Sequence, residues 1–461
     1  MDLRPKYHFT PKENWINDPN GLCYHKGLYH LYYQHNPFAP CWGCMHWGHA
    51  TSKDMLNWKH EEIALKYDNE YDRDGCFSGS AIEKDGDLHI FYTGIKYHKI
   101  KYNEYNIPIA DDPDGEGFTP CQIHAVSHDG GFSFEKILPP AIETDSKYTH
   151  PVHVRDPKVF KTKEGFYRIV LGNTENHKNG SLLFYRSEDL YNWRFEGKWE
   201  SKDFGWGWEC PDFFEIDGKD ILIFSPMGAG DEKIPNISMH LTGKMDFSSF
   251  NFNLENKGLI DEALDIYAPQ TFGYYDEKIK KERRIMIGWI RMLKTFENNN
   301  FCGMMTIPRE CDIENGKFKT YPIKEFNDKR ESNLINQTSN NYFINSENNL
   351  YDIEFIANFD FDLVLFANEN KKGLYITYSK EKSSIIIDRK DVKFEGMAGI
   401  EKKEIHLDSE NFEIRIIADV SIMELFINKG EKTYTATIFP AGFNIFANFK
   451  SENEIKIFSV K

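Results

Sequence analysis

A short, strand-like unit recurs five times in the first 290 residues of this chain. Residues 27–33 (GLYHLYY), 86–92 (GDLHIFY) and 165–171 (GFYRIVL) share a glycine followed by aromatic and aliphatic side chains, and 218–224 and 284–289 are looser copies. Their central residues, separated by 59, 79, 54 and 64 positions, are Leu31, Ile90, Ile169, Ile223 and Ile287. Units of this length can bury an apolar face only against their neighbours, which favours five four-stranded blades in a β-propeller. The alternative is an unrelated β-sandwich with chance similarity.

A second repeated pattern follows several copies of this unit. Residues 52–58, 127–134 and 187–193 each contain Ser-x-Asp followed by an aromatic side chain. Short polar residues of this kind hydrogen-bond their own backbone in turns. We expect each stretch to be a turn that leads into the outer strand of a blade.

The pattern changes near residue 325. Residues 326–349 are rich in Asn, Ser, Glu and Lys and are expected to be a linker. From residue 350 onward, six or more short alternating strands return, as in a β-sandwich. The predicted fold is all-β: a five-bladed β-propeller over 1–325, then an accessory β-sandwich over 350–461.

Charge and hydropathy together limit the partners and the location that we expect for this protein. The net charge of -16 disfavours nucleic acid, and a neutral small molecule fits best. The mean hydropathy is -0.59, and no run of about 18 apolar residues is present, so no membrane span is expected. Residues 1–6 lack the apolar core of a signal peptide, which predicts a cytoplasmic protein. Oligomeric state is left open.

The eight cysteines are expected to be reduced thiols. Cys41 and Cys44 form a C-x-x-C motif, but a zinc site would need a second pair and a redox site a thioredoxin-like context, and neither is present. His46 and His49 are interpreted as structural. We expect neither a metal nor a cofactor.

Three isolated acids stand in proline-containing or aromatic contexts, in different repeat units. Asp18 lies in 15–21 (WINDPNG), Asp156 in RDPK, and Glu209 in WGWECPD. A propeller gathers its inner strands around one axis, so residues far apart in sequence can meet there. Each acid also has a simpler interpretation: a surface turn for Asp18, a local ion pair with Arg155 for Asp156, and a half-buried strand residue for Glu209.

Two carboxyl groups astride a glycosidic bond are the requirement for glycoside hydrolysis. Glu209, between Trp208 and Cys210, is the better general acid because desolvation raises a carboxyl pKa. Asp18, beside Asn17, is expected to be ionised as a nucleophile must be. Asp156 is also expected to be ionised and could stabilise an oxocarbenium-like transition state.

At this point the chain resembles glycoside hydrolase family 32, which contains invertases, sucrose-6-phosphate hydrolases and exo-fructanases. The resemblance rests on WINDPNG at 15–21, RDP at 155–157 and ECP at 209–211, in that order. It covers the first 320 or so residues densely and is looser in the last hundred, where it rests on 419–428.

The resemblance implies a retaining β-fructofuranosidase. Asp18 would attack the anomeric carbon of a fructosyl unit, Glu209 would be the acid/base, and Asp156 would stabilise the transition state. The substrate-binding residues that it implies are Asn17, Gln34, Trp42, Phe77, Ser78, Arg155 and Trp289. The substrates are sucrose, sucrose 6-phosphate or short fructo-oligosaccharides, and which of these is used is left open.

Two features depart from the family pattern. Trp206 adds a bulky ring before Glu209, which could narrow the leaving-group side. The stretch 96–119 is long and carries Lys96, Lys99 and Lys101, then acids from Asp111 to Glu116. It is either a solvated loop or an overhang that selects the substrate, and its lysines are the one local candidate for binding a phosphate.

Other functions remain open at this stage. These are an exo-acting fructanase for inulin or levan, a fructosyltransferase, an inverting five-bladed glycosidase for arabinose or xylose, and a non-catalytic carbohydrate-binding propeller. The last has no need of an acid/base such as Glu209.

Overall fold

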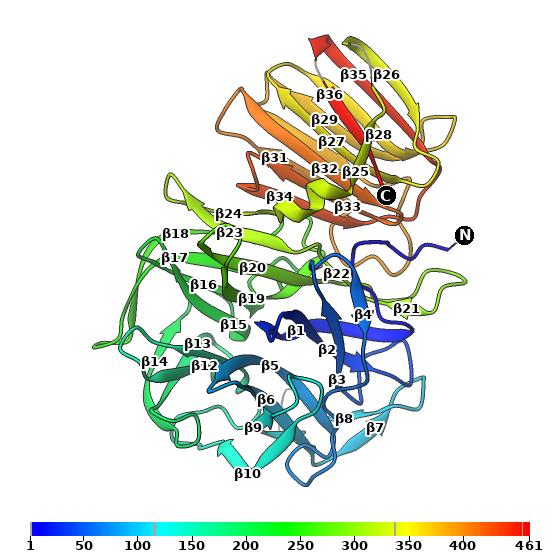
Figure 1. The fold of residues 1–461 in the computed structure, drawn as a ribbon. Coiled ribbons are helices and arrows are strands. Elements are labelled where there is room, and N and C mark those ends of the chain that lie inside the picture. Colours follow the sequence, from blue (N-terminus) through cyan, green and yellow to red (C-terminus); the bar gives the residue numbers. More distant parts are fainter. Residues whose placement is uncertain (1, 114–116, 336–337, 454) are drawn as a thin grey trace.

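The computed structural model describes residues 2–113, 117–335, 338–453 and 455–461, and Figure 1 shows two β-rich bodies joined end to end. Asp114 and Glu116, at the acidic end of the 96–119 stretch, lie outside the described residues. The described ranges contain 36 strands and one 3-10 helix, η1 (Lys324–Lys329).

Five antiparallel sheets form the first body. Blade I contains β1 (Asn14–His25), β2 (Leu28–Asn36), β3 (His46–Ser52) and β4 (Trp58–His60); blade II contains β5 (Gly75–Lys84), β6 (Asp87–Tyr97), β9 (Phe118–Ser127) and β10 (Glu135–Ile142); blade III contains β11 (Arg155–Lys161), β12 (Tyr167–Glu175), β13 (Asn179–Ser187) and β14 (Arg194–Ser201). Blade IV contains β15 (Gly207–Ile216), β16 (Lys219–Met227), β17 (Met239–Asp246) and β18 (Asn251–Leu259); blade V contains β19 (Ile266–Asp276), β20 (Lys281–Ile290), β22 (Met304–Met305), β23 (Arg309–Glu314) and β24 (Lys317–Pro322).

The inner strands close a ring. β1 contacts β5, β5 contacts β11, β11 contacts β15, β15 contacts β19, and β19 contacts β1. A short segment from the end of the propeller completes blade I, because β21 (Phe301–Cys302) pairs in parallel with β1 while β22 pairs with β20. Each copy of the repeated unit supplies the second strand of its blade, namely β2, β6, β12, β16 and β20.

The Ser-x-Asp pattern marks the turn between the third and fourth strands in blades I to III. The Asp54 carboxylate accepts hydrogen bonds from the backbone N–H groups of Leu56 and Asn57 and from the Ser52 hydroxyl. Asp129 and Asp189 accept equivalent bonds in blades II and III. The turn prediction is confirmed.

The second body is a sandwich of two six-stranded sheets. One contains, in spatial order, β25 (Arg330–Asn333), β36 (Ile455–Val460), β27 (Leu350–Ala357), β32 (Phe412–Asp419), β33 (Ile422–Ile427) and β34 (Lys432–Thr437). The other contains β26 (Ser339–Asn345), β35 (Asn444–Asn453), β28 (Phe361–Ala367), β29 (Leu374–Ser379), β30 (Ser384–Asp388) and β31 (Lys402–His406).

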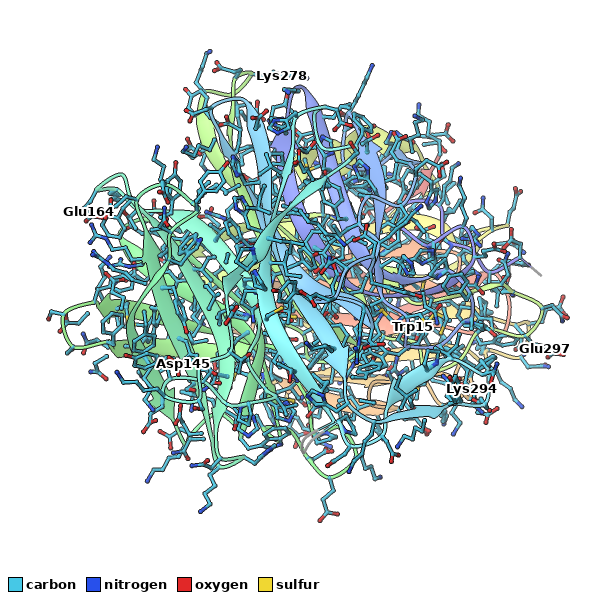
Figure 2. All side chains as sticks on the ribbon, turned by 90° about the horizontal axis from the view of Figure 1, so that it is seen from below. Trp15, Asp145, Glu164, Lys278, Lys294 and Glu297 are labelled. Atoms are coloured by element: carbon cyan, nitrogen blue, oxygen red, sulfur yellow. The ribbon has the colours of Figure 1, made fainter. Side chains whose placement is uncertain are left out.

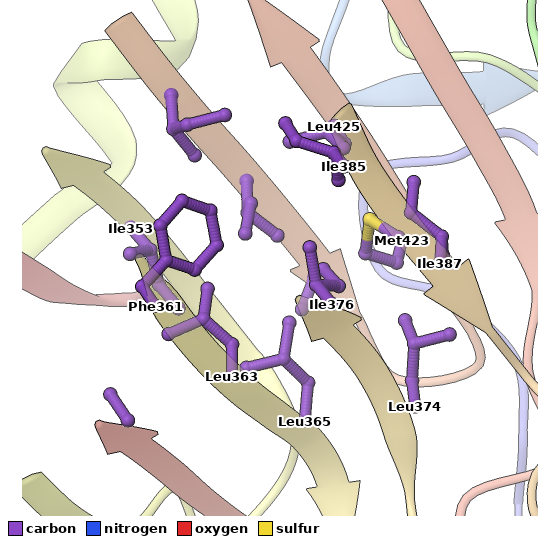
Figure 3. Packing of buried hydrophobic residues seen from close by; sticks show 14 of the residues in the cluster. Ile353, Phe361, Leu363, Leu365, Leu374, Ile376, Ile385, Ile387, Met423 and Leu425 are labelled. Atoms are coloured by element: carbon purple, nitrogen blue, oxygen red, sulfur yellow. The ribbon is translucent and has the colours of Figure 1, made fainter. Parts of the chain in front are cut away.

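Alternation along these strands builds the sandwich core. Leu363 and Leu365 of β28 and Ile376 of β29 point at Ile353 of β27 and Leu425 of β33 across the gap between the sheets (Figure 3). The fold class is therefore confirmed: a five-bladed β-propeller followed by a β-sandwich.

The stretch 326–349, which we expect from its composition to be a linker, contains two sandwich strands. β25 pairs with β36, and β26 pairs with β35. β26 lies at the edge of its sheet, where the polar side chains of a segment such as Ser339–Asn345 can face solvent while Tyr342 and Ile344 pack against the core. We therefore propose Arg330 as the start of the sandwich domain.

A buried ionic network joins the two bodies at the N-terminal segment. The Asp419 carboxylate accepts hydrogen bonds from the backbone N–H groups of Lys6, Tyr7 and His8. The imidazole of His8 lies 2.9 Å from Asp419 Oδ2 through Nδ1 and 3.1 Å from Glu424 Oε1 through Nε2. Glu424 also receives Arg309 of blade V. Every one of these side chains is fully buried, so removing a single partner would leave an unpaired charge.

His8 is expected to make stability depend on pH. Burial alone would lower its pKa, but hydrogen bonds to Asp419 and Glu424 outweigh burial and raise the pKa to about 9. Because the folded pKa exceeds the unfolded value, this contribution is complete below about pH 6.5 and is lost as pH rises through 9; its size is on the order of 3 kcal/mol.

The measurement is the free energy of unfolding between pH 6 and 9.5. We expect the decline above about pH 7.5 in wild type to disappear in His8→Gln, whereas His406→Gln, at an exposed histidine on β31, should keep it. A slope that persists in His8→Gln would contradict the assignment.

Candidate active site

Each inner strand of the propeller carries a β-bulge at the same register. At each bulge the inner strand advances by three residues while the neighbouring strand advances by two. The five bulges lie between Ile16 and Pro19, Cys76 and Gly79, Arg155 and Lys158, Glu209 and Asp212, and Tyr267 and Gln270. One extra residue per blade breaks the alternation of faces and re-aims the side chains next to it. Asp18, Ser78 and Asp156 lie inside these bulges, and Glu209 begins one.

Blades III, IV and V build the bulge from a tripeptide that ends in proline: RDP at 155–157, ECP at 209–211 and YAP at 267–269. The middle residue has a positive φ in all three, 62° at Asp156, 47° at Cys210 and 48° at Ala268. Proline suits the extra position because it has no N–H to leave unpaired in the ladder.

Asp18 is held by three side-chain donors. Ser78 Oγ donates to Oδ2 over 2.5 Å, Asn17 Nδ2 to Oδ1 over 3.0 Å, and the Cys210 thiol to Oδ2 over 3.4 Å. Burial raises the pKa of Asp18, whereas the hydrogen bonds from Ser78 and Asn17 lower it. The orientation of Asn17 is fixed in turn by Trp15 Nε1, which donates to Asn17 Oδ1 over 2.8 Å.

Asp156 is buried, and the Cys210 thiol lies close to both Asp156 and Asp18. Its Oδ2 accepts the backbone N–H of Cys210 over 2.9 Å, and its own backbone N–H donates to Thr93 Oγ1 over 3.0 Å. Burial raises the pKa of Asp156 to about 7; Arg155 opposes this shift, and the charges of Glu209 and Asp18 add to it. We expect an ionised Asp156 when only its neighbour Arg155 is considered. Burial and the charges of Glu209 and Asp18 oppose ionisation, and that expectation leaves them out.

The first residues of the three tripeptides form a hydrogen-bonded chain. Arg155 Nη2 donates to Glu209 Oε1 over 2.9 Å, and the Tyr267 hydroxyl donates to Glu209 Oε2 over 2.5 Å. Burial raises the pKa of Tyr267 well above its ordinary value, so the hydroxyl keeps its proton and donates. Both oxygens of Glu209 are thus oriented by neighbouring blades.

The remaining predicted binding residues surround this centre. Gln34 is buried and donates to the Cys76 carbonyl over 2.9 Å. The Trp42 ring is 38% exposed and meets the half-buried ring of Phe77 edge-on, with centroids 5.6 Å apart. Trp289 is half-buried, 5.7 Å from Trp15 and 6.4 Å from Tyr267 between ring centroids. Asn17, Ser78 and Arg155 thus contact the acids directly, Trp289 contacts Trp15 and Tyr267 beside them, and Gln34, Trp42 and Phe77 meet at Cys76 and Phe77, which precede Ser78 in the chain.

Sequence reasoning missed Tyr267, Cys210 and Thr93 as members of this cluster. Burial and the neighbouring Asp156 and Asp18 carboxylates raise the pKa of Cys210, so its thiol stays protonated and donates to both acids. Aligning the tripeptides that end in proline would have placed Tyr267 beside Arg155 and Glu209. No comparable signal exists for Thr93, which lies on the second strand of blade II.

Within the 96–119 stretch, residues 100–110 form a hairpin of β7 (Ile100–Tyr102) and β8 (Pro108–Ala110). Ile107 packs with Ala39 and Cys44, in the loop that carries Trp42. Lys101 Nζ lies 3.6 Å from Asp111 Oδ1, so its charge is balanced within the hairpin.

Within the described ranges, no three His, Cys, Asp or Glu side chains are grouped so as to hold a metal ion. His46 Nδ1 lies 2.7 Å from the Cys44 carbonyl, and His49 Nε2 lies 3.0 Å from His30 Nδ1. In the same part of the chain, no helix has the length and apolar character needed to cross a membrane.

Two family models match almost the whole chain. The Glycosyl hydrolases family 32 N-terminal domain matches residues 8–322, and the Glycosyl hydrolases family 32 C terminal domain matches residues 317–461. The chain belongs to glycoside hydrolase family 32. This confirms the resemblance drawn from the three motifs and the predicted class of enzyme, a glycoside hydrolase.

Individual relatives of this family 32 enzyme resemble it over nearly their full length. The chain is 32% identical to the sucrose-6-phosphate hydrolase of Escherichia coli and 33% identical to the raffinose invertase of Escherichia coli, each match covering 95% of this chain and 89% of the relative. The solved structure of the Bombyx mori GH32 β-fructofuranosidase BmSUC1 superimposes with a TM-score of 0.83 at 27% identity, covering 100% of this chain and 94% of that one.

Asp156→Asn is expected to stabilise the protein while removing activity. Because the folded pKa of Asp156 lies above the unfolded value near 3.8, stability falls as pH rises from about 4 to 7. Replacing the buried carboxylate by an amide should raise the free energy of unfolding at pH 8 by roughly 1 to 3 kcal/mol.

The matched control is Asp129→Asn, in the blade II turn. Hydrogen bonds from Ser133 and Ser127 hold the pKa of Asp129 down at about 2, against the opposing effect of burial, so this change should lower stability at pH 8. Equal effects of both variants in denaturant titrations would contradict the account.

Proposed function

We propose that this enzyme is a retaining β-fructofuranosidase that cleaves sucrose 6-phosphate and sucrose. The carrying observation is the ring of inner-strand bulges that brings Asp18, Asp156 and Glu209 together with a cation, Arg155, and a hydroxyl donor, Tyr267. The similarity to sucrose-6-phosphate hydrolases over 95% of the chain supports the choice of substrates.

In the first step, a carboxylate oxygen of Asp18 attacks the anomeric C2 of the fructosyl unit. The bond between C2 and the bridging oxygen breaks, and protonated Glu209 gives its proton to that oxygen as the glucosyl group leaves. Arg155 and Tyr267 keep the Glu209 carboxyl aimed at the leaving oxygen. Ser78, Asn17 and Cys210 hold Asp18 in position, which favours a near-attack geometry.

In the second step, Glu209, now a carboxylate, takes a proton from water as the water oxygen attacks C2. The bond between Asp18 and C2 breaks, and fructose leaves with its configuration retained. Asp156 does not form a covalent bond in either step. Its charge stabilises the positive charge that develops at C2 in both transition states.

We also propose a cytoplasmic location. All eight cysteines are free thiols, and six of them are buried. Thiols that remain unpaired are typical of a reducing compartment. A small imported sugar is a suitable substrate there.

The test is a substrate panel of sucrose, sucrose 6-phosphate, kestose, inulin and levan, with kcat/KM measured for each. We expect the two sucrose forms to be the best substrates. Faster turnover of inulin or levan would indicate an exo-fructanase, and transfer to sugars in preference to water would indicate a transferase. No turnover of any member would indicate a binding protein.

Variants separate the roles of the two reacting carboxyl groups. Asp18→Asn should lower kcat by at least about 10³-fold and Glu209→Gln by about 10² to 10⁴-fold. Glu215→Gln, six residues further along β15 and paired with Lys163, is the matched control and should stay near wild type. Full activity in Glu209→Gln would contradict the assignment.

Stereochemistry distinguishes retention from inversion. With methanol as acceptor, a retaining enzyme gives methyl β-fructofuranoside, which does not mutarotate and can be identified by NMR. The α-anomer would contradict a covalent fructosyl intermediate and favour an inverting glycosidase.

A further inference from the structure

Three imidazoles and one indole pack together on one side of the active site. They are His150, His153, His177 and Trp206, which we call the imidazole cluster. Ring centroids are 5.3 Å apart for His150 and His153, 4.7 Å for His150 and His177, and 5.0 Å for His153 and His177. Trp206 lies 5.3 Å from His153 and 5.1 Å from His177. The mechanism proposed above uses none of these four rings.

The cluster lies on the side of the acid/base group. Arg155 donates through Nη2 to Glu209 Oε1 and through Nη1 to His153 Nδ1, each over 2.9 Å. One guanidinium therefore connects the carboxyl that protonates the leaving oxygen to the cluster.

The hydrogen bonds of His150 and His153 fix where their protons lie. His150 Nδ1 accepts the backbone N–H groups of Val152 and His153, over 3.2 and 3.0 Å. His153 Nδ1 accepts from Arg155, which has no acceptor of its own. In the neutral form each ring must carry its proton on Nε2. The Nε2 of His153 is buried, so of these two rings it is His150 that offers an N–H donor to a ligand.

Cationic and acidic side chains both lie beside the cluster. His150 also lines a cavity of about 410 Å³ together with Lys147, Lys198 and Glu175. Glu175 is balanced by Lys198 at 3.0 Å and accepts the Ser181 hydroxyl. His177 is exposed at the rim, on a backbone with φ of 56°.

The lysines of the 96–119 stretch are a weaker candidate for the same role. Lys101 is paired with Asp111. Lys294, which lies outside this stretch but near Glu104 and Tyr105 of the hairpin, is paired with Glu395. Figure 2 separates the two regions, with Asp145, close to the cavity, well apart from Lys294.

We propose that the imidazole cluster binds a phosphate group carried by the leaving sugar, with His150 and His177 as specificity-determining residues. The inference deepens the proposed function and rests on it, because it names what distinguishes sucrose 6-phosphate from sucrose. Trp206 supplies an apolar face for the sugar ring, and the imidazole N–H groups donate to the phosphate oxygens.

Two substitutions remove the imidazoles while keeping the backbone. His177→Asn suits a positive φ, which asparagine tolerates better than most residues. His150→Asn retains an oxygen acceptor for the Val152 and His153 amides but loses the Nε2 donor. His128→Asn is the matched control, an exposed histidine paired with Asp87 at the end of β6 remote from the bulge.

The readout is the ratio of kcat/KM for sucrose 6-phosphate to that for sucrose. Each cluster variant should lower this ratio by about tenfold, mainly through KM, because a charge-assisted hydrogen bond is lost. The control, and Lys99→Ala with Lys101→Ala, should leave it unchanged. A ratio within twofold of wild type in both cluster variants would overturn the proposal, as would a tenfold loss in the lysine variant alone.

A second measurement does not require turnover. Calorimetry should show that wild type binds glucose 6-phosphate more tightly than glucose, and that His177→Asn abolishes the difference. If neither sucrose nor sucrose 6-phosphate were hydrolysed but this difference in binding held, the proposed function would be wrong and the phosphate site would stand. If both were hydrolysed and the difference were absent, the phosphate site alone would be wrong.

Discussion

The five inner-strand bulges are the constraint on which the site depends. A regular strand sends successive side chains to opposite faces, so Asn17 and Asp18, or Arg155 and Asp156, would not serve one site together. One extra residue per blade, at the same register, removes that limit. The propeller ring then brings five such points to one place. The site is thus a property of the repeat, and the chemistry differs between blades because each blade fills its bulge with different side chains.

The same geometry creates an electrostatic problem that the neighbouring residues partly solve. Burial raises the pKa of Asp18 and of Asp156; the charge of Glu209 adds to both shifts, and that of Asp18 adds to the shift of Asp156. Arg155 is the nearest cation, and the Cys210 backbone and thiol donate between the other two acids. A substrate that acquires positive charge at C2 relieves this repulsion only at the transition state. Stored repulsion of this kind favours catalysis over stability.

The sequence predicts the fold well because a repeated strand with regular turns leaves few alternatives. The second strand of each blade and the Ser-x-Asp turns are local patterns, and the structure reproduces them. The three acids were also visible, since proline and aromatic neighbours mark them. Tyr267 and Thr93 cannot be recognised in this way, because each joins the site through a contact with the neighbouring blade, and the sequence does not show that contact. The prediction of a linker at 326–349 rests on polar composition alone, and polar composition does not distinguish a linker from an edge strand such as β26.

The attachment of the N-terminal segment to Asp419 also bears on how the chain reaches its native state. Lys6 and Asp419 are 413 positions apart, and β1 receives β21 from nearly 300 residues downstream. Contacts this distant carry a large loop-closure entropy and form late. During synthesis, Lys6, Tyr7 and His8 are therefore made long before β32, the strand whose Asp419 binds their backbone. Blade I can gain its parallel neighbour once β21 has been made, and its contact with Asp419 only after β32 has followed, so the growing chain exposes an incomplete first blade until then.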